Sequence, residues 1–144
     1  MSYASVLIVS DDTEFARAVA ARWQSERRAP EITVATSDVW QAGSADGYNL
    51  VIVGPVRDSK TSAILSALTA YPSTASLCVC NDVREACELA TEFSHVLILP
   101  REDGWIGTLL LVACEALRRT EAVARAQRAE LPNHLIDCKS VDNP

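Results

Sequence analysis

Short runs of consecutive apolar residues recur along the chain, and polar or turn-forming residues follow each of them. The central run is Leu50–Val53, which stops at Gly54 and Pro55. Such an uninterrupted aliphatic run predicts a strand that is buried on both faces. Four more strands are predicted, at residues 6–9, 31–36, 76–80 and 95–99. The segment 31–36 is more polar than the others, as expected at the edge of a sheet.

Helical patterns separate these strands. Phe15, Val19 and Trp23 recur at intervals of four, which predicts a helix over residues 14–26 with these side chains in the core. The polar residues 10–13 provide its cap. Further helices are predicted at residues 38–42, 60–70, 83–93 and 104–130, the first of them weak. The side chains expected to face the core are Ile64, Leu65 and Leu68 in the helix at 60–70, and Val83, Ala86, Cys87 and Ala90 in the helix at 83–93.

Five strands that alternate with five helices predict an α/β fold, a doubly wound five-stranded parallel sheet. Because crossovers between parallel strands are right-handed, few strand orders are possible. The flavodoxin-like order 2-1-3-4-5 puts the polar second strand at an edge and the central run in the middle. The chain of 144 residues is long enough for one such domain, expected at 1–130. Residues 131–144 contain two prolines and no periodicity, so a disordered tail is expected there.

Charge and hydropathy narrow the possible partners. The net charge is −6 at pH 7, and binding to nucleic acid depends on clustered Lys and Arg, so no nucleic-acid partner is expected. The arginines between 118 and 128 are interspersed with glutamates, which predicts a solvated helix of mixed charge. No run of 18 apolar residues exists, and the first residues lack the basic region of a signal peptide. A cytoplasmic protein without a membrane partner is expected.

The five cysteines, at positions 78, 80, 87, 114 and 138, suit a reducing compartment, where Cys acts as a small apolar residue. Cys78 and Cys80 lie two apart on a predicted strand, so both point to the same face. Together with Cys87 and His95 they suggest a metal site, but the spacing matches no established zinc pattern. Buried thiols are therefore the preferred interpretation.

From about residue 5 to residue 118 the sequence resembles the receiver domain of bacterial response regulators, the CheY-like superfamily. Three segments carry the resemblance in the expected order and spacing: 6–12 (VLIVSDD), 48–53 (YNLVIV) and 96–100 (VLILP). The resemblance implies a phosphorylation site with an acidic pair after the first strand and a phosphoacceptor Asp after the third. It further implies a Thr or Ser after the fourth strand and a Lys before a Pro after the fifth.

The sequence departs from that pattern at most of the implied positions. These positions are occupied by Ser10 and Asp11 (the acidic pair), Gly54 (the acceptor), Cys80 (the hydroxyl) and Leu99 (the Lys), with Val96 at an aromatic switch position. Glycine offers no nucleophile for phosphoryl transfer, and leucine cannot neutralise a phosphoryl charge. The resemblance therefore implies a degenerate receiver, or pseudo-receiver, without the phosphorylation switch.

Two interpretations are open for each of the remaining polar groups of the implied site. Mg²⁺ usually needs one or two well-placed carboxylates, so Asp11, even with Asp12, is only a weak metal candidate, and no cofactor is expected. The alternative for this pair is stabilisation by the helix dipole. Cys80 is either a packed core thiol or a redox sensor with a lowered thiol pKa. The resemblance also implies a cis peptide bond at Leu99–Pro100.

The expected function is a phosphorylation-independent, receiver-like signalling module that binds other proteins in a two-component-type pathway, with a histidine kinase or an output domain as partner. It is not expected to be an enzyme. The alternative is a small-ligand-binding or enzymatic α/β domain that uses the crevice at the carboxyl ends of the strands. No Gly-rich phosphate loop and no nucleophile with a partnered His supports that alternative, and His95 and His134 are interpreted as structural or exposed. A DNA-binding regulator is disfavoured because no helix-turn-helix segment follows the domain.

The last predicted helix, of about 27 residues or roughly 40 Å, is longer than a receiver needs to cover its sheet. A stripe with the alternating four and three spacing of a coiled-coil seam runs along it: Ile106, Leu110, Ala113, Leu117, Thr120, Ala124, Gln127 and Leu131. The second half of this stripe is polar. A weak parallel homodimer is expected, or a monomer whose helix pairs only in a longer chain. The alternative is a helix end that frays into solvent.

Overall fold

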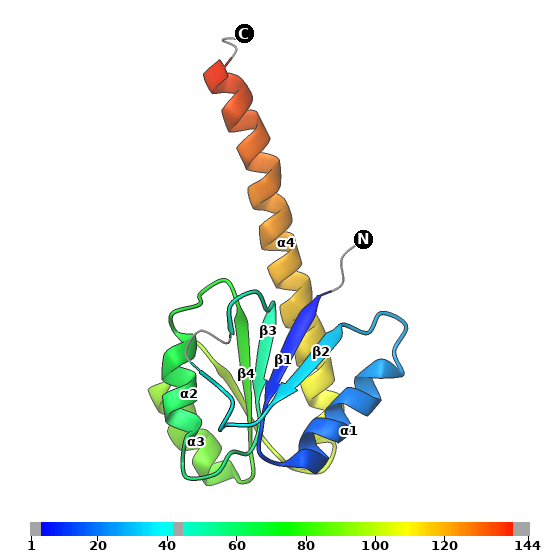
Figure 1. Cartoon of the computed structure of the whole chain (residues 1–144), viewed down its shortest axis with the longest axis vertical. Coiled ribbons are helices and arrows are strands. Elements are labelled where there is room, and N and C mark those ends of the chain that lie inside the picture. Colours follow the sequence, from blue (N-terminus) through cyan, green and yellow to red (C-terminus); the bar gives the residue numbers. More distant parts are fainter. Residues whose placement is uncertain (1–3, 42–44, 140–144) are drawn as a thin grey trace.

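A computed structural model describes residues 4–41 and 45–139, with residue 124 and residues 127–139 described as backbone only. The sheet has five parallel strands in the order β2-β1-β3-β4-β5, as predicted (Figure 1). The strands are β1 (Ser5–Val9), β2 (Glu31–Ala35), β3 (Leu50–Val53), β4 (Ala75–Cys80) and β5 (Leu97–Pro100). All side chains of β3 are buried, which agrees with its uninterrupted aliphatic run. The polar strand β2 lies at an edge.

The register of the sheet aligns the ends of β1 and β3. Val9 lies opposite Val53, and the backbone N–H of Gly54 donates to the Val9 carbonyl at 2.9 Å. One residue further along, the N–H of Asp11 donates to the Pro55 carbonyl at 2.9 Å. The loops after β1 and β3 therefore leave the sheet side by side.

Two helices cover each face of the sheet (Figure 1). On one face lie α1 (Thr13–Gln24) and the first half of α4 (Trp105–Lys139). Phe15, Val19 and Trp23 are buried there, as their spacing predicted, and they join Leu109 and Ala113 of α4 in one hydrophobic cluster. The apolar stripes of the two helices thus pack on the same side of the sheet.

The other face is covered by α2 (Thr61–Leu68) and α3 (Val83–Glu92). In α2 the residues predicted to face the core, Ile64, Leu65 and Leu68, are buried. In α3 the prediction is only partly correct. Ala86 and Leu89 are buried, whereas the predicted core residues Val83, Cys87 and Ala90 are exposed. Successive residues of a helix differ by about 100°, so 83, 87 and 90 lie together on one flank of the inward stripe through 86, 89 and 93, and this flank is exposed.

The weak helix predicted at residues 38–42 is wrong for the residues that the structure describes, since Ser37–Val39 form a turn. The N–H groups of Val39 and Trp40 both donate to the Thr36 carbonyl, at 3.2 and 3.1 Å. Trp40 packs on the hydrophobic core, and Ala45 is fully buried. These two side chains cover the sheet where a fifth helix was expected, so the described part of the chain has four helices. Residues 42–44 lie outside the described residues.

Helix α4 begins one residue later than predicted and continues well past the predicted end at residue 130, to Lys139. The helix continues through the proline at 132, although a proline inside a helix lacks the backbone N–H of one helical hydrogen bond. Residues 140–144 of the expected tail lie outside the described residues. At 35 residues the helix is about 52 Å long, and its second half projects beyond the amino ends of the strands (Figure 1). No helix in the described part of the chain is both long and apolar enough to cross a membrane.

The peptide bond at Leu99–Pro100 is trans, so the expected cis bond is wrong; the described residues contain no cis bond. Strand β5 continues through Pro100, which lies opposite Cys80. The next residue, Arg101, donates its N–H to the Cys80 carbonyl at 2.7 Å. The chain therefore stays extended beside β4 instead of turning sharply at the proline.

Candidate functional site

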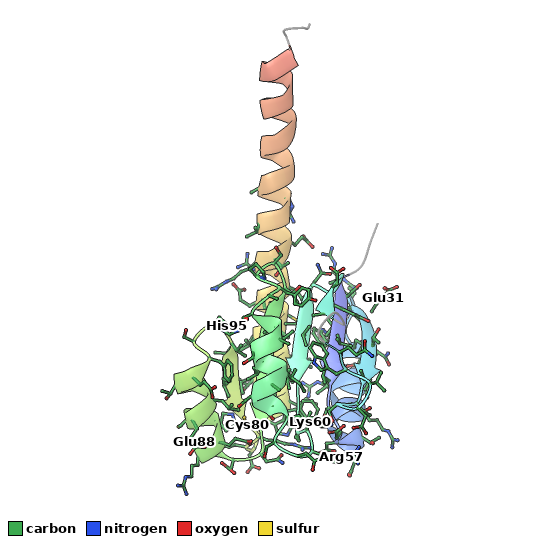
Figure 2. The ribbon with its side chains drawn as sticks, turned by 60° about the vertical axis from the view of Figure 1, so that its left-hand side comes forward. Glu31, Arg57, Lys60, Cys80, Glu88 and His95 are labelled. Carbon is green, nitrogen blue, oxygen red and sulfur yellow. The ribbon has the colours of Figure 1, made fainter. Side chains whose placement is uncertain are left out.

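The candidate site lies at the carboxyl ends of the strands, where open parallel sheets usually bind ligands. The loops after β1, β3 and β5 meet at this end. Figure 2 shows Arg57, Lys60 and Cys80 near it, whereas His95 lies toward the opposite end of the sheet. The metal site suggested for Cys78, Cys80, Cys87 and His95 is therefore not assembled, and the described residues contain no group of three or more His, Cys, Asp or Glu that could hold a metal ion.

Gly54, at the phosphoacceptor position, has no room for a side chain. A Cβ atom added there would meet three ring carbons of Phe15, with Cδ2 only 2.6 Å and Cζ 2.9 Å away. The ring cannot easily give way, because Phe15 is fully buried in the core. A glycine at the end of a strand often marks such a close approach. The space of the acceptor side chain is thus occupied by an aromatic ring from α1.

Phe15 belongs to a small aromatic cluster at this end of the molecule. Its ring stacks on that of Trp105, with centroids 5.2 Å apart and an interplanar angle of 14°. The guanidinium carbon of Arg101 lies 5.5 Å from the Phe15 centroid and 5.1 Å from the Trp105 centroid. Offset aromatic stacking and cation–π contact are both favourable at these distances. The cluster joins α1, the loop after β5 and the first residue of α4.

Asp11 is the one carboxylate that matches the implied acidic pair, and both of its oxygens accept hydrogen bonds from neighbouring loops. Its side chain is 4% exposed. Oδ1 accepts from the Ser37 N–H at 2.9 Å, and Oδ2 accepts from the Ser37 hydroxyl at 2.6 Å and from the Arg57 N–H at 2.7 Å. Burial opposes ionisation, but these hydrogen bonds outweigh it and lower the pKa of Asp11 from 3.8 to about 2. Asp11 therefore ties together the loops after β1, β2 and β3.

Asp12 has two other tasks. As the N-cap of α1 it accepts from the Phe15 N–H at 3.1 Å, and through Oδ2 it pairs with Nη1 of Arg101 at 2.8 Å. The hydrogen bond from Arg101, followed by that from the Phe15 backbone, holds the pKa of Asp12 below its ordinary value. This arrangement agrees with the interpretation of an acidic residue at a helix N-terminus.

Ser10 replaces the first acid of the implied pair and is buried. Its hydroxyl donates to the Pro55 carbonyl at 2.8 Å and accepts from the Asp12 N–H at 3.1 Å. A carboxylate cannot donate to that carbonyl, so a serine suits this position. The Ser10 side chain thus connects the loops after β1 and β3.

The hydroxyl and Lys positions hold apolar core groups. Cys80 is 3% exposed, and its sulfur lies 4.0 Å from that of Cys78 on the same face of β4. The hydrogen bond between the thiols and burial raise the pKa of Cys78, and the same bond lowers the pKa of Cys80. Leu99, in place of the Lys, packs partly buried against the cluster beneath α1 and α4. Val96 is buried on the opposite face of the sheet.

Sequence reasoning missed the residues that fill the site: Arg101, Trp105 and the Phe15 ring in its particular position. Gly54 was the available signal, because a glycine at a strand end indicates that another group approaches closely. Arg101 directly follows the strand that was expected to end in a Lys. It places a cation near the site, but that cation is paired with Asp12.

An open groove lies at the other end of the sheet, between the amino ends of β3 to β5 and residues 111–123 of α4. Tyr48, Tyr71, Leu97, Leu111 and Arg118 are among the residues that line it. Leu97 and Leu111 are exposed, at 45% and 74%. None of the residues implied by the receiver resemblance contributes to this groove.

These features define an α/β domain of the doubly wound, flavodoxin-like class. No protein-family model matches the sequence, and no curated protein matches it. Solved structures do match. A CheY-like response regulator receiver domain from Methanospirillum hungatei JF-1 superposes with a TM-score of 0.65 at 18% identity, over 84% of this chain and 98% of that chain.

Two further structures give similar values. The signal receiver domain of a putative Luxo repressor protein from Vibrio parahaemolyticus superposes with a TM-score of 0.68 at 17% identity, over 88% of this chain and 98% of that chain. A chain described as adenylate cyclase from Rhodopirellula baltica superposes with a TM-score of 0.67 at 12% identity, over 90% of this chain and 97% of that chain. The chain thus has the fold of response-regulator receiver domains.

Proposed function

We propose that this protein is a degenerate receiver domain, a signalling module that works in the cytoplasm without being phosphorylated and acts by binding other proteins. Its partner would be a histidine kinase or an output domain of a two-component-type pathway. The receiver fold supports the signalling role. The loss of phosphorylation is supported by the Phe15 ring, which occupies the space beside Gly54 where an acceptor carboxylate would lie.

The chemistry of the site supports the same conclusion. Phosphoryl transfer to a receiver requires a carboxylate nucleophile and a metal ion with oxygen ligands. Position 54 offers no nucleophile, and the oxygens of Asp11 are already engaged by Ser37 and Arg57. Asp12 is engaged by the α1 backbone and by Arg101. A metal ion would have to displace these partners before it could bind.

The same filling of the crevice argues against an enzyme or a small-ligand binder at this end of the sheet. Phe15 fills the space beside Gly54, Trp105 stacks on it, and Arg101 packs on both rings. A ligand retained by the purified protein and detected by native mass spectrometry would support that alternative instead.

Helix α4 supports an additional proposal, a weak parallel homodimer. Leu110 and Ala113 of the coiled-coil stripe are buried against the domain, and Leu117 is partly buried. The stripe therefore cannot pair with a partner helix before about residue 120. Such a short, mostly polar seam would give a weak dimer.

The test of the proposed function is incubation of the full chain with acetyl phosphate and Mg²⁺, followed by measurement of its intact mass. A receiver domain that retains its acceptor Asp, treated in parallel, serves as the positive control. We expect no mass gain in this protein. A hydroxylamine-labile gain of one phosphoryl group would overturn the proposal.

A further inference from the structure

Arg101 links two helices that begin far apart in the sequence. Its backbone is fixed by the hydrogen bond to the Cys80 carbonyl. Its side chain crosses to α1, where Nη1 donates to Oδ2 of Asp12, a residue 89 positions earlier. Both side chains are largely shielded, with 25% and 32% exposure. Partial burial makes such a pair less sensitive to screening than a fully exposed one.

The aromatic rings extend this link to α4. Trp105 is the first residue of α4, and its ring lies flat on that of Phe15 in the first turn of α1. Arg101 lies against both rings, so its charge interacts with their π faces and with Asp12 together. The start of α4 thus contacts the start of α1 through a cation and two stacked rings.

The position of Phe15 depends on Gly54. With any side chain at residue 54, the ring would have to shift from its present place, which would disturb its stack with Trp105. The residue that removes the phosphoacceptor is therefore also the residue that allows the cluster to form. The missing phosphoacceptor and the aromatic cluster therefore both depend on Gly54.

We propose that Asp12, Phe15, Arg101 and Trp105 form a latch that holds the amino-terminal end of α4 in one fixed position against α1. This inference rests on the proposed function, because it gives α4 the role of an output element whose position is set without phosphorylation. A phosphoryl group adds a charge that can be removed again, whereas the charge of Arg101 in the latch is permanent. It ties together the loop after β5 and the first turns of both helices.

The latch is tested with two variants in the full chain. Arg101→Met keeps most of the side-chain length but removes the charge. Asp12→Asn removes the charge of the partner and keeps a good N-cap for α1. The matched controls remove ion pairs that lie outside the latch: Arg119→Met, which loses an exposed pair with Glu115 on α4, and Asp38→Asn, which loses the pairs with Arg57 and Lys60 near the same end of the sheet.

The measurement is backbone hydrogen exchange followed by mass spectrometry. We expect Arg101→Met and Asp12→Asn each to speed exchange at least tenfold in residues 105–113, with β3 unchanged. The double variant should be no faster than the faster single variant, because the two residues act as one unit. Both controls should exchange like the unaltered protein in this segment.

Three results would overturn the latch. These are unchanged exchange in both variants, an equal rise in β3 and α4, which would indicate general destabilisation, and an equal rise in the controls. None of these results bears on the mass measurement that tests the proposed function. Conversely, a phosphoryl mass gain in the unaltered protein would overturn the proposed function and leave the exchange result standing.

Discussion

The ring of Phe15 lies too close to Gly54 to leave room for the first carbon of any side chain at that position, with its Cδ2 2.6 Å from where that carbon would be. Core packing in proteins is dense, so a buried ring and an added atom cannot share that space without a shift of the surroundings. In this chain Gly54 and Phe15 form a matched pair, one small and one large, across the end of β3. A substitution at either residue should therefore change the effect on stability of a substitution at the other.

Replacement of Gly54 by Ala should destabilise the protein by about 1–3 kcal/mol, the usual effect of overpacking a core. The added methyl would press on the buried Phe15 ring. Urea unfolding monitored by circular dichroism measures the change in free energy. Gly107→Ala in α4 is the matched control, because nothing lies within 4 Å of its added Cβ. That variant should be neutral or stabilised by up to about 1 kcal/mol.

The effect of Gly54→Ala should change sign when the ring is removed. Phe15→Val alone should cost a few kcal/mol through lost burial and the cavity it leaves, on the order of large-to-small core changes. In that background the methyl at 54 has space, and Ala restricts the unfolded chain more than Gly does, by about 0.4–1 kcal/mol. Gly54→Ala should then be neutral or stabilising. Equal destabilisation in both backgrounds would show that the two residues are not coupled.

The sheet could be predicted from sequence because its strands carry their own signal. The aliphatic run Leu50–Val53 became β3 with the predicted bounds, and the strand order followed from the polar character of β2. The helix expected at 38–42 had only a weak pattern, and tertiary contacts overrode it. Asp38 pairs with Lys60, and Trp40 packs on the core. Weak local propensity usually yields to such contacts.

The sequence could predict which groups the site lacks, but not which side chains fill it. The absent carboxylate at Gly54 and the absent Lys at Leu99 can be read from the sequence once the resemblance is recognised. What fills the space cannot, because the contact of Arg101 with Asp12 joins residues 89 positions apart. Helical periodicity placed Phe15 in the core correctly. It carries no information on which strand end the ring would reach.

Asp11 should make stability depend on pH in the acidic range. Its folded pKa of about 2 lies below the ordinary value of 3.8, so its contribution is full above about pH 5 and is lost as the pH falls toward 2. Asp11→Asn removes an acceptor, because an amide nitrogen cannot accept from the Arg57 N–H. We expect a loss of about 1–3 kcal/mol at pH 7.

Urea unfolding of both proteins between pH 7 and pH 2 measures this dependence. The difference between the unaltered protein and Asp11→Asn should shrink as the pH falls and nearly vanish by pH 2. Asp46→Asn, at an exposed aspartate near the other end of the sheet, controls for the general effect of a lost charge. A difference that stays constant over the whole range would mean that the Asp11 charge does not stabilise the fold.

The four cysteines whose side chains the structure describes should divide into two classes by reactivity. Cys78 and Cys80 are 1% and 3% exposed, whereas Cys87 and Cys114 are exposed on helices. Iodoacetamide should label Cys87 and Cys114 in the native protein and leave the β4 pair unlabelled until urea unfolds the chain. Peptide mass spectrometry identifies the labelled sites. Rapid labelling of Cys80 under native conditions would revive its interpretation as a redox sensor.

Self-association through α4 is the last prediction. The stripe that packs on the domain ends near Leu117 and Thr120, both partly buried, so only the part of α4 beyond them can pair with a second copy. Ala124 and Leu131 continue the four and three spacing in the sequence, whereas Ala126 lies off the seam and is exposed. A charge on the seam would oppose its counterpart in a parallel dimer, and a charge off the seam would stay in water.

Sedimentation of the full chain over a range of concentrations should show a weak monomer–dimer equilibrium. The double variant Ala124→Glu, Leu131→Glu should be monomeric throughout, and Ala126→Glu should behave like the unaltered protein. Truncation after Arg118 should also give a monomer, and its fold should persist because Leu109, Leu110 and Ala113 still cover the sheet. If the full chain and the truncated chain are both monomeric at the highest concentration reached, α4 does not mediate self-association. The projecting half of the helix would then be available only to a different partner.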